Sequence, residues 1–226
     1  MKLLYSNILP LGTADDQQTI IDCFQEQLAK ADYVEIAVGY VSRASLEELD
    51  NLITDYSIKQ ICLNIGMYYI EGMPESSYHT AVKINKKWRA SKTGEIRIVR
   101  SFKYHGKLYC FYKDGVPFSA NIGSANLGVI KLEASNRRQY EISSLTTDPS
   151  ECKEISDFIQ KLKSPACSAN IEDISDMPLI FEKNTALSGI ELVAEVPPSN
   201  VEFYKRCSAY ASFLLPLKVP AYAERH

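Results

Sequence analysis

Helix-like and strand-like segments alternate along most of this chain, and that alternation constrains the fold more than any other feature of the sequence. Apolar residues at helical spacing predict helices over 13–31, 42–56, 77–91 and 150–164. Apolar and β-branched runs predict strands over 33–41, 59–67, 95–101, 106–113, 116–124 and 138–146. Strands that alternate with helices favour an α/β sandwich.

The last three strands of the pattern follow one another without an intervening helix. The strands at 106–113 and 116–124 are separated by Asp114 and Gly115, a dipeptide typical of a hairpin turn. A hairpin makes its two strands antiparallel, whereas strands joined through helices run parallel. We therefore predict an α/β fold with a mixed central sheet.

Capping residues predict where the first two helices begin. Thr13 or an adjacent aspartate is the expected cap of the first helix, and Ser42 or Ser45 is the expected cap of the second. Beyond the last helix the pattern changes. Residues 164–181 are predicted to be a connection, and 189–196 are predicted to form one more strand.

The size and hydropathy of the chain fit a globular protein. With 226 residues, 46% of them hydrophobic, it can bury the core of one large domain, or of one domain with an appendage. No apolar run is long enough to cross a bilayer, and the first residues lack the apolar stretch and cleavage site of a secretory signal. We expect a cytoplasmic protein without a membrane partner.

Cysteine and histidine give little support for a metal site. The six cysteines are scattered, with no CxxC pair, so reduced thiols that mostly fill the core are expected. The three histidines are His79, His105 and His226, too few for a site built from several histidines. A site built from carboxylates remains open.

Positive charge is concentrated in one part of the sequence although the net charge is only −3. Between residues 83 and 107 nine basic residues are opposed by Glu95 alone. On charge alone, a solvated helix face followed by a strand is the favoured interpretation. A track for a phosphate backbone is the second.

His105 stands at the end of this basic segment, two residues before Lys107. Residues two apart on a strand face the same side, so an imidazole and an ammonium are expected to project together. Burying this pair in an ordinary core would cost several kcal/mol of desolvation. A strand end over an anion-binding cleft avoids that cost, with lysine as the charge for a phosphate oxygen and histidine as nucleophile or proton carrier.

The next strand ends in a turn of small and polar residues. Gly123 lets a ligand approach the backbone, and Ser124 and Asn126 can donate hydrogen bonds to one phosphoryl group. On the third strand, Glu141 is a carboxylate that could orient a catalytic histidine. For Asn121, near the end of the second strand, contact with substrate and capping of the turn both remain open.

These residues resemble the signature of the phospholipase D superfamily, which is a histidine-x-lysine strand, a glycine-serine-x-asparagine turn and a later acidic residue. The resemblance implies a phospholipase D-like α-β-α sandwich with a mixed central sheet. It makes His105 the nucleophile and Glu141 the orienting acid. The phosphate ligands that it implies are Lys107, Ser124 and Asn126. Lipid-cleaving members usually carry an aspartate where this chain has Tyr112, which favours the nuclease branch.

Within that branch, the chain up to about residue 195 resembles the catalytic domain of restriction endonucleases of the BfiI and NgoFVII type. The resemblance implies DNA as substrate, no cofactor and no metal, and a domain at 1–195. Residues 196–226 would then be a linker or tail toward a separate DNA-recognition domain. Because the superfamily uses two facing motif copies and this chain has one, a homodimer with a shared active site is expected.

Two other functions remain open from the sequence. One is a phospholipase D-like hydrolase of lipid or small-molecule phosphodiesters, which no membrane-binding amphipathic segment supports. The other is a non-catalytic DNA-binding module, which the presence of every motif residue makes the least favoured.

Overall fold

Strands and helices alternate along the computed structural model, which describes residues 1–131 and 139–181. The elements are β1 (Lys2–Tyr5), β2 (Gln18–Thr19), α1 (Ile20–Leu28), β3 (Tyr33–Val38), α2 (Arg43–Asp55), β4 (Gln60–Ile65), α3 (Tyr68–Glu71), β5 (Met73–Pro74), α4 (Glu75–Ala90), β6 (Gly94–Val99), β7 (Leu108–Lys113), β8 (Val116–Gly123), the 3₁₀ helix η1 (Leu127–Ile130), β9 (Ile142–Thr146), α5 (Pro149–Leu162), β10 (Ser168–Asn170), the 3₁₀ helix η3 (Ile171–Asp173) and β11 (Leu179–Ile180). Residues Met1–Leu179 form one compact unit.

A mixed sheet lies at the centre of this unit. Within the described residues its strand order is β10-β6-β4-β3-β7-β8-β9-β1-β2. Strands β3, β4 and β6, which are joined through helices, pair in parallel. Strands β7, β8 and β9 pair antiparallel, and β7 joins β3 antiparallel. The predicted α/β class with a mixed sheet is confirmed.

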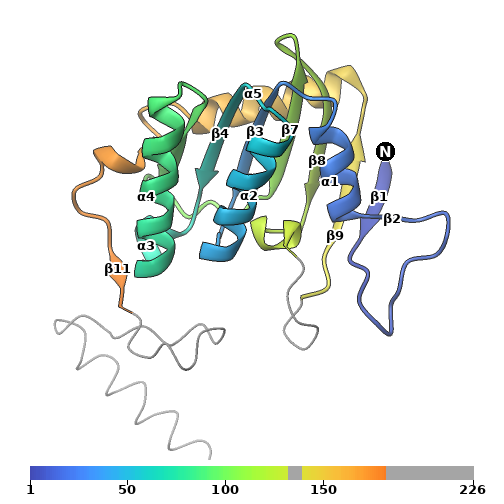
Figure 1. Cartoon of the computed structure of the whole chain (residues 1–226), viewed down its shortest axis with the longest axis horizontal. Helices are drawn as coiled ribbons and strands as arrows, with labels where there is room; N and C mark the ends of the chain where they lie inside the picture. The colour runs from blue at the N-terminus through green and yellow to red at the C-terminus, as the bar shows by residue number, and fades with distance from the viewer. Residues whose placement is uncertain (132–138, 182–226) are drawn as a thin grey trace, which may run out of the picture. The chain divides into compact units, whose positions relative to one another are not determined.

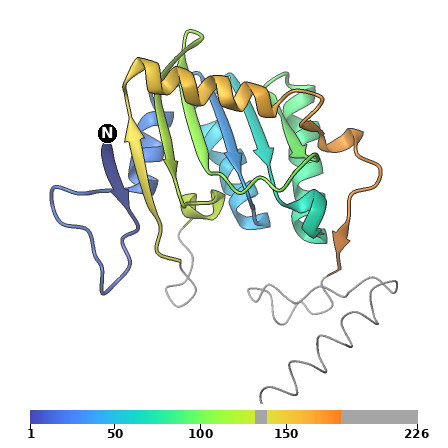
Figure 2. The same ribbon diagram turned by 180° about the vertical axis from the view of Figure 1, so that it is seen from behind.

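Helices cover both faces of the sheet. In Figure 1, α1, α2 and α4 lie in front of the strands, and Figure 2 shows α5 crossing the opposite face. The two faces of β7 explain this arrangement, because alternate residues point to opposite sides. Tyr109 and Phe111 pack edge-on against Phe24 of α1, with ring centroids 5.8 and 5.6 Å apart. Cys110 and Tyr112 pack in the core under α5.

Capping residues fix the helix starts, with one correction to the sequence analysis. Helix α2 begins after Ser42. The Ser42 hydroxyl accepts a hydrogen bond from Ser45 N, and the Ser45 hydroxyl accepts one from Ser42 N, so both predicted candidates take part in a capping box. The first helix begins later than predicted. Its cap is Thr19, not Thr13 or an adjacent aspartate, because Gln18 and Thr19 pair with β1 as a short strand.

The hairpin turn is confirmed, and the segment that follows α5 differs from prediction. Asp114 and Gly115 both have positive φ, 51° and 80°, as a tight hairpin requires. Residues 164–181, predicted to be a connection, contain β10, η3 and β11, which are too short to show a clear periodicity. The strand predicted at 189–196 and the domain boundary at 195 lie outside the described residues.

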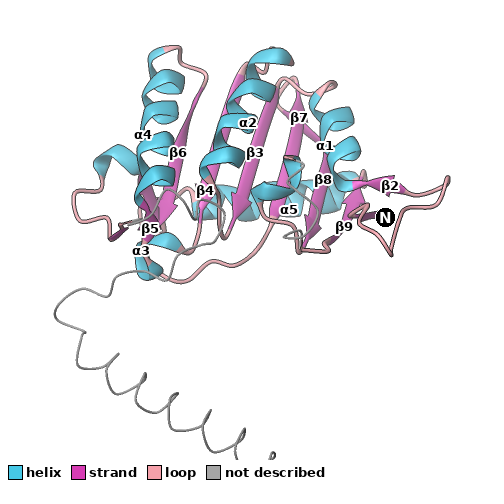
Figure 3. Ribbon diagram, turned by 60° about the horizontal axis from the view of Figure 1, so that its bottom comes forward, coloured by secondary structure: helices cyan, strands magenta, loops and turns pink. Residues whose placement is uncertain are grey.

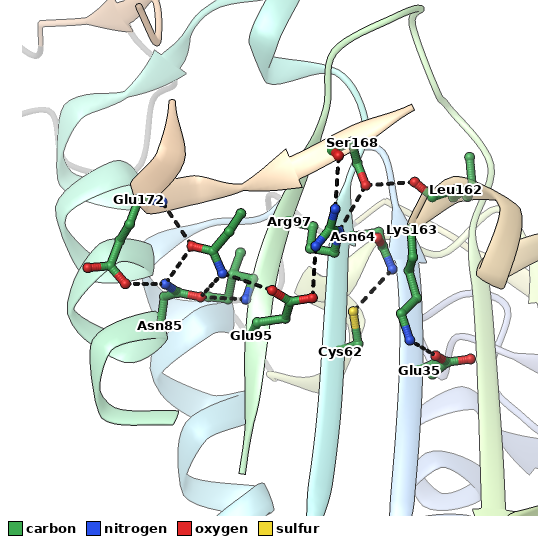
Figure 4. Close-up of polar contacts among 12 residues, drawn as sticks. Glu35, Cys62, Asn64, Asn85, Glu95, Arg97, Leu162, Lys163, Ser168 and Glu172 are labelled. Carbon is green, nitrogen blue, oxygen red and sulfur yellow. Dashed lines mark hydrogen bonds and ion pairs between the residues drawn. The ribbon is translucent and has the colours of Figure 1, made fainter. Parts of the chain in front are cut away.

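A buried polar network under α5 ties the sheet to the elements that follow that helix (Figure 4). Glu35 of β3 is fully buried and accepts from Lys163 Nζ at 2.7 Å, and from Gln160 and Tyr112 as well. Arg97 of β6 pairs with Glu95 at 2.9 Å and donates to the Ser168 carbonyl at 2.9 Å. These contacts satisfy charges that would otherwise destabilise the core.

Candidate active site

The ends of four neighbouring strands lie together at one end of the sheet. The motif residues lie next to three of them, β7, β8 and β9. Because β7 runs antiparallel to β3, the beginning of β7 lies beside the end of β3. The end of β8 and the beginning of β9 follow in register. Figure 3 brings this edge forward. The topology therefore collects His105, Ser124 and Glu141, which are distant in sequence, at one place.

His105 and Lys107 lie together as expected, although both precede β7, which begins at Leu108, and do not lie on the strand as predicted. Lys107 Nζ is 3.0 Å from His105 Nε2 and donates to the His105 carbonyl at 2.6 Å. The imidazole is exposed, whereas Lys107 is only 6% exposed. Burial lowers the pKa of Lys107, and the negative charge of Glu141 acts in the opposite direction. The result is an accessible imidazole with a partly desolvated ammonium beside it.

Ser124 and Glu141 form a second pair at the same edge. The Ser124 hydroxyl donates to Glu141 Oε2 and accepts from Ile142 N at 3.1 Å. Gly123 permits this close approach of β8 and β9, since a Cβ there would lie 2.3 Å from Ser143 Oγ. Within the described residues Glu141 makes no hydrogen bond to His105, so its predicted role as the orienting acid stays a prediction.

Asn126 faces the site from the start of η1. Its Oδ1 accepts from Tyr40 N at 3.1 Å, so the amide nitrogen is the end that remains available as a donor. No described residue accepts a hydrogen bond from that nitrogen.

Asn121 lies inside β8 opposite Tyr109 and is 3% exposed, so it neither caps the turn nor reaches the surface.

Glycines at the ends of β3 and β4 make room for these side chains. A Cβ on Gly39 would lie 3.1 Å from His105 Cδ2. At Gly66 a Cβ would lie 2.0 Å from the backbone oxygen of Tyr104, the residue before His105. The sequence analysis missed both glycines, and it missed Tyr40 and Glu71 on the same side of the site. A glycine near the end of each predicted strand, 33–41 and 59–67, was the available signal.

Four of the nine basic residues between residues 83 and 107 form ion pairs with acidic side chains. The ion pairs are Lys87 with Asp50, Arg89 with Glu172, Arg97 with Glu95 and Lys103 with Glu71. The guanidinium of Arg100 lies 5.1 Å from the ring centroid of Tyr69. These contacts favour an ordinary protein surface over a continuous phosphate track, although Lys83, Lys86 and Lys92 form no ion pair within the described residues.

Neither a metal cluster nor a membrane-spanning helix occurs in the described part of the chain. No group of three or more His, Cys, Asp or Glu side chains is placed to hold a metal ion within residues 1–131 and 139–181. In the same residues, every helix is too short or too polar to cross a bilayer. His79 is an exposed residue of α4 that lies 3.5 Å from Glu75.

The site therefore offers an imidazole surrounded by an ammonium, a hydroxyl and an amide. Lysine, serine and asparagine are hydrogen-bond donors to phosphoryl oxygens, and the imidazole has a nitrogen lone pair for attack. Tyr112, at the position of the lipases' aspartate, points to the other face of the sheet and bonds Ser156 at 2.9 Å. A phosphodiester is the substrate class that fits this group of donors.

Comparison with known proteins agrees with this geometry. Residues 18–176 match the family described as the NgoFVII restriction endonuclease N-terminal PLD domain. No curated protein matches the chain. A phosphatidylserine synthase from Haemophilus influenzae Rd KW20 is structurally similar with a TM-score of 0.47 and 13% identity, over 74% of this chain and 39% of that chain. Since the family match covers well over half of the sequence and includes the motif residues, the chain belongs to the family of NgoFVII restriction endonuclease N-terminal PLD domains.

Proposed function

We propose that this chain is a DNA-cleaving phosphodiesterase domain in which His105 is the nucleophile. Family membership supports phosphodiester chemistry, and the observation that carries the proposal is the 3.0 Å contact between Lys107 Nζ and His105 Nε2 at an open sheet edge. That contact puts a nucleophilic nitrogen and a phosphate-binding charge at one point. Ser124 and Asn126 flank it as further donors.

Cleavage would proceed in two displacements. His105 Nε2 attacks the phosphorus, a bond forms between nitrogen and phosphorus, and the bond from phosphorus to one ester oxygen breaks. The departing oxygen takes a proton. Water then attacks the phosphohistidine, gives up a proton, and releases His105. In both steps Lys107, Ser124 and Asn126 stabilise the charge on the phosphoryl oxygens.

These donors supply the electrostatic stabilisation that Mg²⁺ gives to other nucleases. We therefore propose that cleavage needs no metal ion and survives chelation. Lys107 is well suited to this part, because its single contact with Nε2 can be exchanged for a phosphoryl oxygen as substrate enters. Ser124 must likewise turn its hydroxyl proton from Glu141 to the phosphate.

A general acid is needed for the departing oxygen, and the described residues of one chain place a single histidine, His105, at the site. We propose that His105 of a second copy donates this proton in a two-fold symmetric homodimer.

DNA recognition is proposed to lie outside the catalytic domain. Residues 196–226 would then be a linker or tail toward a recognition domain, and this chain alone would bind DNA weakly and without base preference. Because four of its nine basic residues are paired with acids, only part of the basic segment is available for phosphate contacts. Nanomolar, sequence-selective binding by this chain alone would place recognition within it after all.

Plasmid DNA incubated with the protein in EDTA tests the proposal. We expect cleavage by the wild type and none by His105→Ala, and His79→Ala, an exposed histidine of α4, should cleave like the wild type. Liposome hydrolysis without DNA cleavage would instead favour the lipid-cleaving alternative. Loss of DNA cleavage in EDTA, restored by Mg²⁺, would contradict metal independence.

Mixing wild-type and His105→Ala subunits tests the shared site. If both chains contribute His105 to one site, the mixed dimers are inactive or nearly so. Half of the wild-type activity in the mixed dimers, or an active monomer in sedimentation, would contradict the shared site.

A further inference from the structure

Tyr40 contacts two of the motif residues although it belongs to neither motif. Its backbone N–H donates to Asn126 Oδ1 at 3.1 Å. Its ring stands edge-on to the His105 imidazole, with centroids 5.8 Å apart and an interplanar angle of 74°. One residue thus touches both the proposed nucleophile and one proposed phosphate ligand, from the side of the site opposite β8 and β9.

Several contacts hold Tyr40 in this place. Its hydroxyl donates to Glu71 Oε2 at the end of α3, and the other oxygen of Glu71 accepts from Lys103 Nζ at 3.0 Å. Its ring also packs edge-on against Tyr68, 5.4 Å away. The Tyr68 hydroxyl accepts from Val41 N at 3.2 Å, which ties down the backbone next to Tyr40.

The bond to Asn126 selects which end of the amide faces the site. Because the oxygen is occupied by Tyr40 N, the amide nitrogen is turned outward as a donor. A phosphoryl oxygen needs a donor, so this orientation is the productive one. The opposite orientation would point a carbonyl oxygen at the phosphate.

The ring contact acts on His105 in a complementary way. The imidazole lies between the Tyr40 ring and Lys107 Nζ, so two groups from different strand ends limit its rotation. Gly39 allows this arrangement, because a Cβ there would lie only 3.1 Å from His105 Cδ2. An exposed histidine without such contacts would sample several rotamers and attack less often.

The carboxylate of Glu71 is the anchor of this arrangement. Hydrogen bonds from Tyr40 and Lys103 lower the pKa of Glu71, so it remains an ionised acceptor at neutral pH. Among the described residues, the charged groups near His105 are then Lys107 just before β7, Glu141 before β9, Glu71 on α3 and Lys103 in the loop before β7. The opposite charges of Glu71 and Lys103 offset each other, so the groups that hold Tyr40 add no net charge next to His105.

We propose that Tyr40 is a positioning residue, whose ring holds His105 and whose backbone N–H holds Asn126 in their productive orientations. This inference rests on the proposed function of His105 as nucleophile. It adds a residue after β3 to a site whose motif residues all lie between the loop before β7 and the start of β9.

Two substitutions of Tyr40 separate its ring from its hydroxyl. Tyr40→Leu removes the edge-on contact with His105 and keeps the backbone bond to Asn126, so kcat should fall about 100-fold while KM stays within about two-fold. Tyr40→Phe keeps the ring and loses only the anchor on Glu71, so it should recover most of that loss. Tyr69→Phe is the matched control, because its hydroxyl bonds Asp176 instead and its activity should be that of the wild type.

The imidazole NMR signals give a readout that does not need activity. The chain has three histidines, so His105 is assigned by comparison with His79→Gln and His226→Gln. In Tyr40→Leu we expect the His105 signals to shift and broaden while those of His79 stay unchanged, and in Tyr40→Phe we expect them to stay sharp.

The two readouts distinguish the possible failures. Wild-type kcat in Tyr40→Leu, or sharp His105 signals in that variant, would overturn the positioning role. A raised KM with an unchanged kcat would also overturn it. If the wild type cleaves no phosphodiester but the His105 signals still broaden in Tyr40→Leu and stay sharp in Tyr40→Phe, the positioning of His105 stands and the proposed function fails.

Discussion

Lys107 Nζ and His105 Nε2 lie 3.0 Å apart at the exposed edge of the sheet, and the lysine is held there by a second bond to the His105 carbonyl. In the proposed function, the ammonium therefore marks the nitrogen that faces the phosphate. A phosphoryl group that replaces this contact meets a positive charge and a lone pair at once. That arrangement leads to predictions that can be measured separately.

Ser124 and Glu141 should act as a unit because they share a hydrogen bond. Ser124→Ala removes one donor to the phosphoryl oxygens and should lower kcat about 100-fold. Glu141→Gln should also lower it, and the double variant should lose less than the product of the two single losses. Values of kcat for the wild type, the two single variants and the double variant test this. Losses that multiply would show that the two side chains act independently.

Gly66 should matter for activity because of its contact with Tyr104. In Gly66→Ala the new methyl group would lie 2.0 Å from the Tyr104 backbone oxygen, so the segment leading into His105 must shift. A displacement of about 1 Å can reduce turnover about 100-fold. Gly128→Ala is the control, since nothing lies within 4 Å of a Cβ there. Equal activity in the two variants, with both proteins folded by circular dichroism, would contradict the contact.

The alkaline limit of activity should reflect Lys107. A lysine binds phosphate only while protonated, and burial lowers the pKa of Lys107, so its charge is lost at lower pH than that of an ordinary lysine near 10.4. As the pH is raised, activity should therefore begin to decline before the pH reaches that value. Lys107→Arg keeps its charge at every pH tested and should move the alkaline limit upward, even though its rate is lower. An unchanged limit in the pH profile would assign it to another group.

The network under α5 should support stability without taking part in catalysis. Lys163→Met leaves the fully buried Glu35 without its cation, so the free energy of unfolding should fall by about 3 kcal/mol. Lys153→Met removes an exposed pair with Asp157 on the same helix and should change it by less than about 1 kcal/mol. Urea unfolding gives both values. Lower activity per folded molecule in Lys163→Met would connect the network to the site.

Local sequence patterns predicted much of the fold, and the resemblance to a known family supplied the proposed roles of the candidate site residues. Long periodic segments such as the one that forms α2 indicate their structure directly, and residues two apart, such as His105 and Lys107, share a side. Thr19 was missed as a helix cap because β2 forms only by pairing with β1, a contact that no local pattern contains. The same reason applies to Tyr40 and Glu71, which reach His105 only after β3, α3 and β7 have assembled.

The paired state of the basic segment was also beyond local prediction. Its partners Asp50 and Glu172 lie far away in sequence, so the charge run looked more open than it is. Conversely, the predicted orienting role of Glu141 followed from residue types alone. The geometry adds that its carboxylate bonds Ser124, which gives the serine a defined position before substrate arrives.

The most direct test of the central claim is the stereochemical course at phosphorus. A DNA substrate with one chiral phosphorothioate at the cleaved position is hydrolysed in EDTA, and the configuration of the product is determined. Attack by His105 followed by attack of water on the phosphohistidine consists of two in-line displacements, so retention is expected. Inversion would mean a single displacement by water and would contradict a covalent intermediate on His105.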